Sequence, residues 1–295
     1  MGALIDRKNI DATGALLALL TSVFWGANTV AIKLGLSDAP PLRLAWMRFV
    51  VGGVAIALWA WATGRLAGFR VGREEWRPML MLALIFTAQI GSMNIGTSLT
   101  SAAHASILLN LYSVHTVVLS HFLIPGDRLT LRRVAGVVIA YTGIIVLFGG
   151  QAGARSASLL GDAIVFVSAF LLAERLVYLA RAVQRLDPVK LLLSQAAVGC
   201  TLFMAGSALT ETVPTTWTPR LVASIAYQGL LIAGFNFVVN LWLLQRYRPS
   251  SLVPFFLTQP LFGVITAALL TGDPLTWELL IAGIAVAIGM GLSTR

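Results

Sequence analysis

Residues Asn94–Gly143 read NIGTSLTSAAHASILLNLYSVHTVVLSHFLIPGDRLTLRRVAGVVIAYTG, and a related stretch recurs at Asn240–Gly289. A shift of 146 residues places Asn94 on Asn240, and it also aligns Gly126-Asp127 with Gly272-Asp273. Leu, Ala and Val match by chance in apolar sequence, but Asn, Gly and Asp at a constant offset are less frequent coincidences. We therefore interpret the chain as an internal duplication.

The match extends upstream of this stretch. A shift of 147 residues places Pro41 on Pro188 and Arg43 on Lys190. The sequence thus predicts two copies of one unit. They occupy residues 12–149 and 159–292 and together cover nearly the whole chain.

The composition indicates a membrane protein. The 295 residues are 58% hydrophobic and only 11% charged, with a mean hydropathy of +0.85, whereas soluble domains carry about 25% charged residues. The net charge of +9 does not indicate nucleic-acid binding, because the Arg residues lie in short loops between apolar runs and form no basic face. The single cysteine, Cys200, excludes an internal disulfide or a Cys metal cluster.

Ten apolar runs approach the length of about 20 residues that a membrane-spanning helix needs. The first is too long for a signal-peptide core, so we expect it to be a retained helix. The sequence predicts an all-α polytopic membrane protein with ten transmembrane helices. The runs are residues 12–36, 42–62, 78–96, 101–123, 133–149, 159–179, 189–210, 221–245, 251–272 and 277–292.

The Lys and Arg residues predict the orientation. Most of the 21 fall in the segments that are cytoplasmic if the N-terminus is inside, so we expect both termini in the cytoplasm. Five helices per copy is an odd number, so the second copy is expected to be inverted. Inverted repeats with a binding site at the midplane are frequent in secondary transporters. The alternative is a duplicated scaffold without transport activity.

A stripe of small and amide residues is the first candidate for substrate binding. Gly229, Ala233, Asn236 and Asn240 share one face of the eighth run, and Asn94 is the repeat mate of Asn240. Such a stripe can be a helix-packing face with interhelical hydrogen bonds. It can also be a cavity wall whose amides bind the carboxylate and ammonium of a zwitterion. Both interpretations stay open.

Further polar residues near mid-span are candidate substrate contacts. Tyr112 and His115 lie in the fourth run, where a buried, satisfied histidine is equally compatible. No metal is expected, because no carboxylate or Cys stands at ligand spacing. In the ninth run Pro254 and Pro260 predict a bent segment, and Gln259 with the freed backbone carbonyls is a candidate site for an ammonium group.

Charged residues within the runs are candidates for gating or coupling. Glu174 and Arg175 are adjacent, and neighbours on a helix point about 100° apart, so they need not pair. Glu174, with Tyr178 one turn on, is a candidate proton carrier, internal gate or member of a structural ion pair. Arg48 aligns with the uncharged Gln195 and would pair with a carboxylate or a substrate anion.

The sequence resembles the EamA family of the drug/metabolite transporter superfamily. The family's opening motif is matched by Phe24-Trp25-Gly26-Ala27-Asn28. Each copy also closes on the family's Gly-acid, Gly, Gly pattern, in which we interpret the later glycines as helix-packing faces. These patterns are Gly126-Asp127, Gly136 and Gly143 in the first copy, and Gly272-Asp273, Gly283 and Gly289 in the second. The chain departs from the family in having Asp in place of Glu and no Pro midway through the fourth run.

Within the family the chain is most similar to the bacterial YddG-type exporters of aromatic and other amino acids. The resemblance implies a central cavity framed by both copies, peripheral fifth and tenth helices, and alternating access in the inner membrane. We add Trp25 and Asn28 of the opening motif to the candidate substrate-binding residues. The expected partners are a small-molecule substrate and the lipid bilayer; no cofactor is expected, and the expected unit is a monomer.

Other functions have weaker support in the sequence. A nucleotide-sugar or phosphorylated-metabolite carrier needs Lys or Arg in its cavity, and only Arg48 and Arg175 lie within the runs. A small multidrug pump needs an acidic residue in the first run, which has none. The chain shows no Gly-x-Ser-x-Gly or His-Glu-x-x-His enzyme motif, and no pore-loop repeat or ring of like charges that would indicate a channel.

The two interpretations of the amide stripe make different predictions for Asn240→Ala. If Asn240 lines a cavity, we expect the variant to lower substrate flux more than it lowers thermal stability. Flux into proteoliposomes and the unfolding temperature of the same preparation measure the two effects. Equal losses of both would assign the stripe to packing.

Overall fold

The structure is a computed structural model that describes residues 10–66, 70–123, 129–149, 158–182, 185–247, 252 and 255–293. These residues form an all-helical bundle without a β-strand, as the hydropathy predicts. The first copy contains α1 (Ala12–Gly26), α2 (Asn28–Leu36), α3 (Pro41–Ala62), α4 (Trp76–Leu99), α5 (Ala102–Asn110), α6 (Tyr112–Leu123) and α7 (Leu131–Gly149). The second contains α8 (Leu159–Ala182), α9 (Pro188–Thr210), α10 (Pro219–Ala226), the π-helix η2 (Tyr227–Asn236), α11 (Phe237–Arg246), α13 (Gln259–Leu270) and α14 (Trp277–Ser293).

The helices have the lengths and the apolar surfaces of a polytopic membrane protein. Six helical stretches of the described chain are long and apolar enough to cross a bilayer. Their bounds are Ala12–Leu36, Pro41–Ala62, Trp76–Leu99, Ala102–Leu123, Pro188–Thr210 and Pro219–Asn240. Large apolar side chains such as Leu131 and Leu209 are 86% and 85% exposed, which lipid contact explains.

Several of the predicted runs are broken within the bundle. The first divides at Ala27 and the fourth at Leu111. In the ninth run α13 begins at Gln259 with Pro260 in its first turn, where Pro is tolerated because no backbone donor is lost. The bend predicted there is confirmed at this end, while Pro254 lies outside the described residues. The eighth run changes to the π-helix η2, a form that is rare and often found at functional sites.

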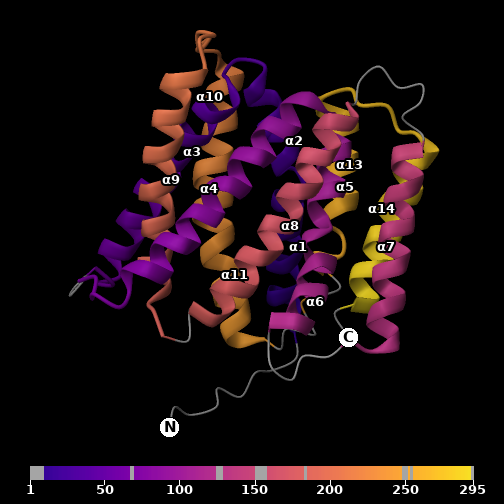
Figure 1. Ribbon diagram of the computed structural model, residues 1–295, viewed down its shortest axis with the longest axis horizontal. Coiled ribbons are helices and arrows are strands. Elements are labelled where there is room, and N and C mark those ends of the chain that lie inside the picture. Colours follow the sequence, from indigo (N-terminus) through magenta and orange to yellow (C-terminus); the bar gives the residue numbers. More distant parts are fainter. Residues whose placement is uncertain are drawn as a thin grey trace.

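Contacts between the two copies come in equivalent pairs. When each helix in a contact is replaced by its mate in the other copy, the result is another contact of the structure. The contact of α4 with α9 corresponds to that of α3 with η2, and the contact of α6 with α8 corresponds to that of α1 with α13. Helices in equivalent positions also pack on each other, namely α3 on α9 and α7 on α14. The α7–α14 pair stands at one edge of the bundle, and α1 begins at the same end of the bundle at which α14 finishes (Figure 1). This pattern is what two copies related by a pseudo-two-fold axis would produce.

Two basic residues that align in the sequence make corresponding contacts at opposite ends of the antiparallel α3–α9 pair. Arg43, at the start of α3, donates from Nη2 to the carbonyl of Glu211 at the end of α9, at 3.0 Å. Lys190, at the start of α9, donates from Nζ to the Arg70 carbonyl at 2.7 Å and pairs with Glu75 at 3.0 Å, both beyond the end of α3. Each copy thus holds the loop of the other in the same manner.

Glycines allow α7 and α14 to approach closely. A Cβ placed at Gly143 would lie 2.5 Å from the Cβ of Ala285, and one at Gly289 would lie 2.6 Å from the carbonyl oxygen of Gly136. Real Cβ atoms do not approach backbone this closely, so the backbone would have to move. These close approaches confirm the predicted helix-packing role of Gly143 and Gly289, which are repeat mates.

We expect Gly289→Ala to destabilise the protein, because the added methyl group must displace the α7 backbone. Overpacking of this kind costs about 1–3 kcal/mol. Gly149→Ala is the matched control, since a Cβ there meets no atom within 4 Å. Thermal unfolding in detergent should give a lower midpoint for Gly289→Ala alone; equal midpoints for the two variants would contradict the packing assignment.

Candidate functional site

The interrupted helices meet at a tight crossing inside the bundle. A Cβ at Gly26, the last residue of α1, would lie 2.6 Å from the carbonyl oxygen of Gln259 at the start of α13. A Cβ at Gly263, one turn into α13, would lie 3.0 Å from the Gly26 carbonyl oxygen and on top of the Ser106 hydroxyl of α5. The ends of α1, α5 and α13 are therefore packed together, and α2 contacts both α5 and α13.

Buried polar atoms without partners occur next to this crossing. The unpartnered atoms are Asn28 Oδ1, Thr29 Oγ1, Ser106 Oγ and Asn110 Oδ1. Asn28 begins α2 and Asn110 ends α5, so both amides stand at helix breaks. An unsatisfied buried polar group costs about 1–3 kcal/mol, so these atoms make the crossing a candidate site for a polar ligand or a water molecule. Asn28 was predicted as a substrate contact from the opening motif, whereas Asn110 was not selected from the sequence.

The predicted stripe of amides takes part in contacts between helices. Asn236 donates from Nδ2 to the carbonyl of Thr21 in α1 at 3.1 Å, and Asn94 donates to the carbonyl of Pro41 in α3 at 2.9 Å. Both amides are fully buried. Asn240 is half-buried and donates to the Asn236 carbonyl of its own helix at 2.9 Å. The packing interpretation accounts for the Nδ2 donors of Asn94 and Asn236, whereas the Oδ1 atoms of both have no hydrogen-bond partner in the described chain.

The small residues of the same stripe also pack on α3. A Cβ at Gly52 would lie 2.7 Å from the Cβ of Ala233, and a Cβ at Gly229 would lie 2.6 Å from Val51 Cγ1. The stripe thus brings η2 against α3 and does not form an open wall.

The predicted aromatic and histidine contacts are dispersed. His115 is 2% exposed, and its ring packs against Tyr141, Phe166 and Phe170 with centroids 5.1–5.8 Å apart. This position lies among α6, α7 and α8, and the ring does not take part in the Gly26–Gly263 crossing.

The remaining predicted contacts lie nearer the helix breaks. Tyr112 is half-buried at the first position of α6, directly after the Leu111 break, and Gln259 is 3% exposed at the first position of α13. Trp25 is next to the Gly26 crossing but 38% exposed. Gln259, Asn28 and Asn110 thus place three amides at three helix ends.

Two of the four candidate gating residues make hydrogen bonds to glutamines. Arg48 donates to Gln228 and Arg175 donates to Gln195, each at 2.8 Å. Arg175 does not pair with the neighbouring Glu174, which is half-buried. Tyr178 is half-buried and packs against the apolar cluster around Met79, Leu82 and Leu191.

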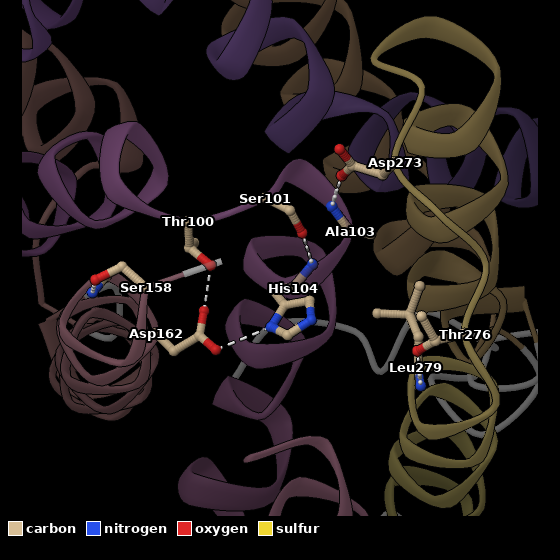
Figure 2. A network of polar contacts seen from close by, with 10 residues as sticks. Thr100, Ser101, Ala103, His104, Ser158, Asp162, Asp273, Thr276 and Leu279 are labelled. Atoms are coloured by element: carbon tan, nitrogen blue, oxygen red, sulfur yellow. Dashed lines mark hydrogen bonds and ion pairs between the residues drawn. The ribbon is translucent and has the colours of Figure 1, made fainter. Parts of the chain in front are cut away.

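A polar network at one end of the bundle was not selected from the sequence. Asp162, fully buried in the first turn of α8, accepts from the Thr100 hydroxyl and contacts His104 Nδ1 at 2.9 Å (Figure 2). Asp273 of the second Gly-Asp motif accepts from the backbone N–H of Ala103 at 2.9 Å, beside the Ser101 cap of α5 (Figure 2). The equivalent Asp127 lies outside the described residues.

This network holds the backbone at the ends of α4 and α5. Lys33 donates to the carbonyls of Thr97 and Ser98 at 3.0 and 3.2 Å, where the negative end of the α4 dipole favours a cation. Asp273 supplies the anion that the start of α5 favours. The Gly-acid motif therefore satisfies a helix end in this structure. The repeated Gly-Asp motif is visible in the sequence, but the sequence does not show which helix end the aspartate contacts.

At the same end of the bundle Asp38 joins the two copies. Arg220 donates to its carboxylate from Nε and Nη2, each at 2.8 Å, and the Thr218 hydroxyl donates at 2.7 Å. Asp38 lies in the loop between α2 and α3. The hydrogen bonds from Arg220 hold the pKa of Asp38 below its ordinary value.

The comparisons with known proteins agree with this architecture. A model of the "EamA-like transporter family" matches residues 12–149 and again residues 159–295. A "Probable amino-acid metabolite efflux pump" of Salmonella typhimurium is 27% identical over 290 residues, which cover 93% of this chain and 92% of that protein. An "Uncharacterized transporter YoaV" of Bacillus subtilis is 22% identical over 276 residues, with 92% and 94% coverage. One crystal structure aligns over 97% of both chains with a TM-score of 0.68 at 19% identity, which shows a shared fold.

We expect Arg220→Gln to lower the unfolding temperature at neutral pH and to have less effect in acid. The pKa of Asp38 is lower in the folded than in the unfolded chain, so its contribution is present above about pH 4, the ordinary carboxyl pKa, and is lost as the pH falls through the folded value. Unfolding midpoints of both proteins between pH 3 and 7 test this. A difference that does not change with pH would contradict the role of the Asp38 carboxylate.

Proposed function

Because this chain belongs to the EamA-like transporter family, we propose that it is a secondary transporter that exports amino acids or similar small metabolites. It would work in the bacterial inner membrane by alternating access. The proposed unit is one chain in the lipid bilayer, without a cofactor. Catalysis has no part in this proposal, in line with the transporter names of the relatives.

The observation that carries the proposal is the meeting of broken helices at unpartnered polar groups. Discontinuous transmembrane helices that expose backbone and amide groups near the midplane are a recurrent form of transporter substrate site. Here Asn28, Asn110 and Gln259 stand at the ends of α2, α5 and α13. In a state open to one side, these amides and the adjacent carbonyls would bind the polar groups of a small metabolite.

The paired contacts between the copies support the rest of the mechanism. We propose ten transmembrane helices in two inverted five-helix copies, at residues 12–149 and 159–292, with both termini cytoplasmic and a central cavity between the copies. Support comes from the contacts that exchange between copies and from the corresponding roles of Arg43 and Lys190. Two similar units of opposite orientation can open to opposite sides by equivalent rocking motions.

Amino acids are the proposed substrates because two of the relatives are named for them. The Salmonella typhimurium and Escherichia coli proteins are each described as a "Probable amino-acid metabolite efflux pump", at 27% and 25% identity. The amides at the helix breaks supply the donors and acceptors that a zwitterion needs.

Coupling to protons depends on Glu174 in this proposal. It is half-buried within α8 and makes no ion pair with Arg175. A proton-coupled cycle would use this carboxylate as the carrier, whereas facilitated diffusion would leave it a gating or structural role.

We expect saturable uptake of at least one amino acid into proteoliposomes of the purified protein. The substrates are radiolabelled phenylalanine, methionine and threonine, each measured with and without a pH gradient. If the gradient drives accumulation, Glu174→Gln should abolish the accumulation and leave downhill exchange intact. If the pH gradient has no effect on the wild type, Glu174 has no role as a proton carrier. An effect of Glu174→Gln on downhill exchange would then reflect its gating or structural role.

Protein-free liposomes are the control, and the Asn28→Ala variant tests the proposed site. Asn28→Ala should reduce flux at least several-fold while the protein remains folded, because it removes an unpartnered amide at the helix break. Uptake that rises linearly with concentration would contradict a carrier. Absence of flux for every amino acid would remove amino acids from the proposal.

A further inference from the structure

Two arginines lie inside the bundle with neutral hydrogen-bond partners. Arg48 of α3 is 6% exposed and donates from Nη1 to Gln228 Oε1 of η2 at 2.8 Å. Arg175 of α8 is half-buried and donates from Nε to Gln195 Oε1 of α9 at 2.8 Å. Each guanidinium is thus held by an amide carbonyl of another helix, with further N–H donors left over, since a guanidinium has five.

The two guanidinium groups flank one pair of aromatic rings. Arg48 lies over the Phe49 ring and Arg175 over the Phe86 ring, each 4.6 Å from the centroid. The two rings pack edge to face with centroids 4.8 Å apart. The two guanidinium groups are thus linked through one pair of rings and form one cluster with two positive charges. We call it the arginine cluster (Arg48, Arg175, Gln195, Gln228, Phe49 and Phe86).

The cluster lies at membrane depth. Arg48 and Gln195 are each seven residues into their helices, which start at Pro41 and Pro188 from opposite ends of the bundle. At 1.5 Å per residue Arg48 lies about 10 Å from one end of the bundle, and Gln195, the partner of Arg175, lies about 10 Å from the opposite end, so both positions are inside the bundle but at different depths. Water is scarce at both depths, and a charged side chain there is costly and marks a functional site by default.

No carboxylate of the described chain neutralises the cluster. The ion pairs of the described residues join His104 to Asp162, Lys190 to Glu75 and Arg220 to Asp38, all near helix ends. Glu174 precedes Arg175 but does not bond to it. Buried charges are ordinarily paired, and aromatic faces and amide oxygens compensate a cation only in part. Two positive charges that no carboxylate of the described residues neutralises favour the binding of an anion.

We infer that the arginine cluster binds the oxyanion of the transported metabolite, a carboxylate or a phosphate, between the Arg48 and Arg175 guanidinium groups. This inference names the substrate class of the proposed transporter and so rests on the proposed function. Guanidinium groups bind carboxylate and phosphate through two parallel hydrogen bonds. Gln228 and Gln195 hold the two groups in position, and Ser224 in turn bonds to Gln228 Nε2 at 2.9 Å.

The arrangement also explains how the two copies share one ligand. Arg48 comes from the first copy and Arg175 from the second, and each is held by a glutamine of the second copy. A rocking motion of the copies would alter the distance between the two cations. An anion between them would offset their repulsion in the state that brings them closest, so that the loaded transporter would close around its substrate.

Ligand binding to the purified protein tests the inference separately from transport. Matched acids and analogues that lack the oxyanion are added to the detergent-solubilised protein, and the unfolding temperature is measured. The pairs are phenylalanine with phenylalaninamide, succinate with succinamide, and glycerol 3-phosphate with glycerol. We expect at least one acid to raise the midpoint in a saturable manner and its partner without the oxyanion to have no effect. Which acid does so decides between carboxylate and phosphate.

Variants of the two arginines provide a second test of the inference. Arg48→Gln and Arg175→Gln should each weaken binding of that acid about tenfold or more, as expected for loss of a charged hydrogen bond. Arg246→Gln is the matched control, because Arg246 also lies over an aromatic ring, 4.3 Å from the Trp242 centroid, but is exposed at the end of α11. Its affinity should equal that of the wild type.

A loss of folding in these variants is separated from a loss of binding by a charge exchange. Arg48→Gln combined with Gln228→Arg moves the guanidinium to the other end of the same hydrogen bond and should recover part of the affinity. Equal stabilisation by an acid and its amide, no stabilisation by any anion, or wild-type affinity in both arginine variants would overturn the inference. Anion binding without transport would instead count against the proposed function and leave the binding site standing.

Discussion

The requirement that polar groups be satisfied without water governs this structure. Inside a bilayer each backbone donor and acceptor must find its partner in the protein, which explains why the described residues are helical. Helix ends near or within the membrane are the difficult places. Lys33 satisfies the end of α4, Asp273 and Ser101 satisfy the start of α5, and Glu211 accepts from the backbone N–H groups of Leu42 and Arg43 at the start of α3.

Function is expected where this requirement is met least well. The broken helices bring Asn28 and Asn110 together with unpartnered oxygens, and the arginine cluster holds two cations with amide partners only. Both are costly in a closed bundle, and in our proposal the binding of a polar, anionic metabolite would offset this cost. The two sites are compatible with one substrate, whose oxyanion would bind the arginines and whose remaining polar groups would bind the amides. The glycines at the α1–α13 and α7–α14 crossings keep the surrounding helices closely packed.

The sequence selected candidate residues, but it did not define the contacts that they make. Arg48 and Arg175 were identified because charge is rare within apolar runs, and the bend at Pro260 followed from its chemistry. Asn94 and Asn236 were assigned to a possible cavity wall, but they bond to the carbonyls of Pro41 and Thr21. Periodicity defines the face on which an amide lies, but it does not define which helix covers that face.

The sequence by itself determined that the chain is an all-helical membrane protein of the EamA family, because hydropathy, helix length and repeated Gly-Asp motifs are local properties of the chain. Only the tertiary structure decided which polar groups of the described residues find a partner in the protein and which do not. Arg48 and Gln228 are 180 residues apart, and no pattern in either segment pairs them. Their contact arises because α3 packs against η2 in the folded bundle. Water is scarce there, so an unpaired polar group would stay unsatisfied.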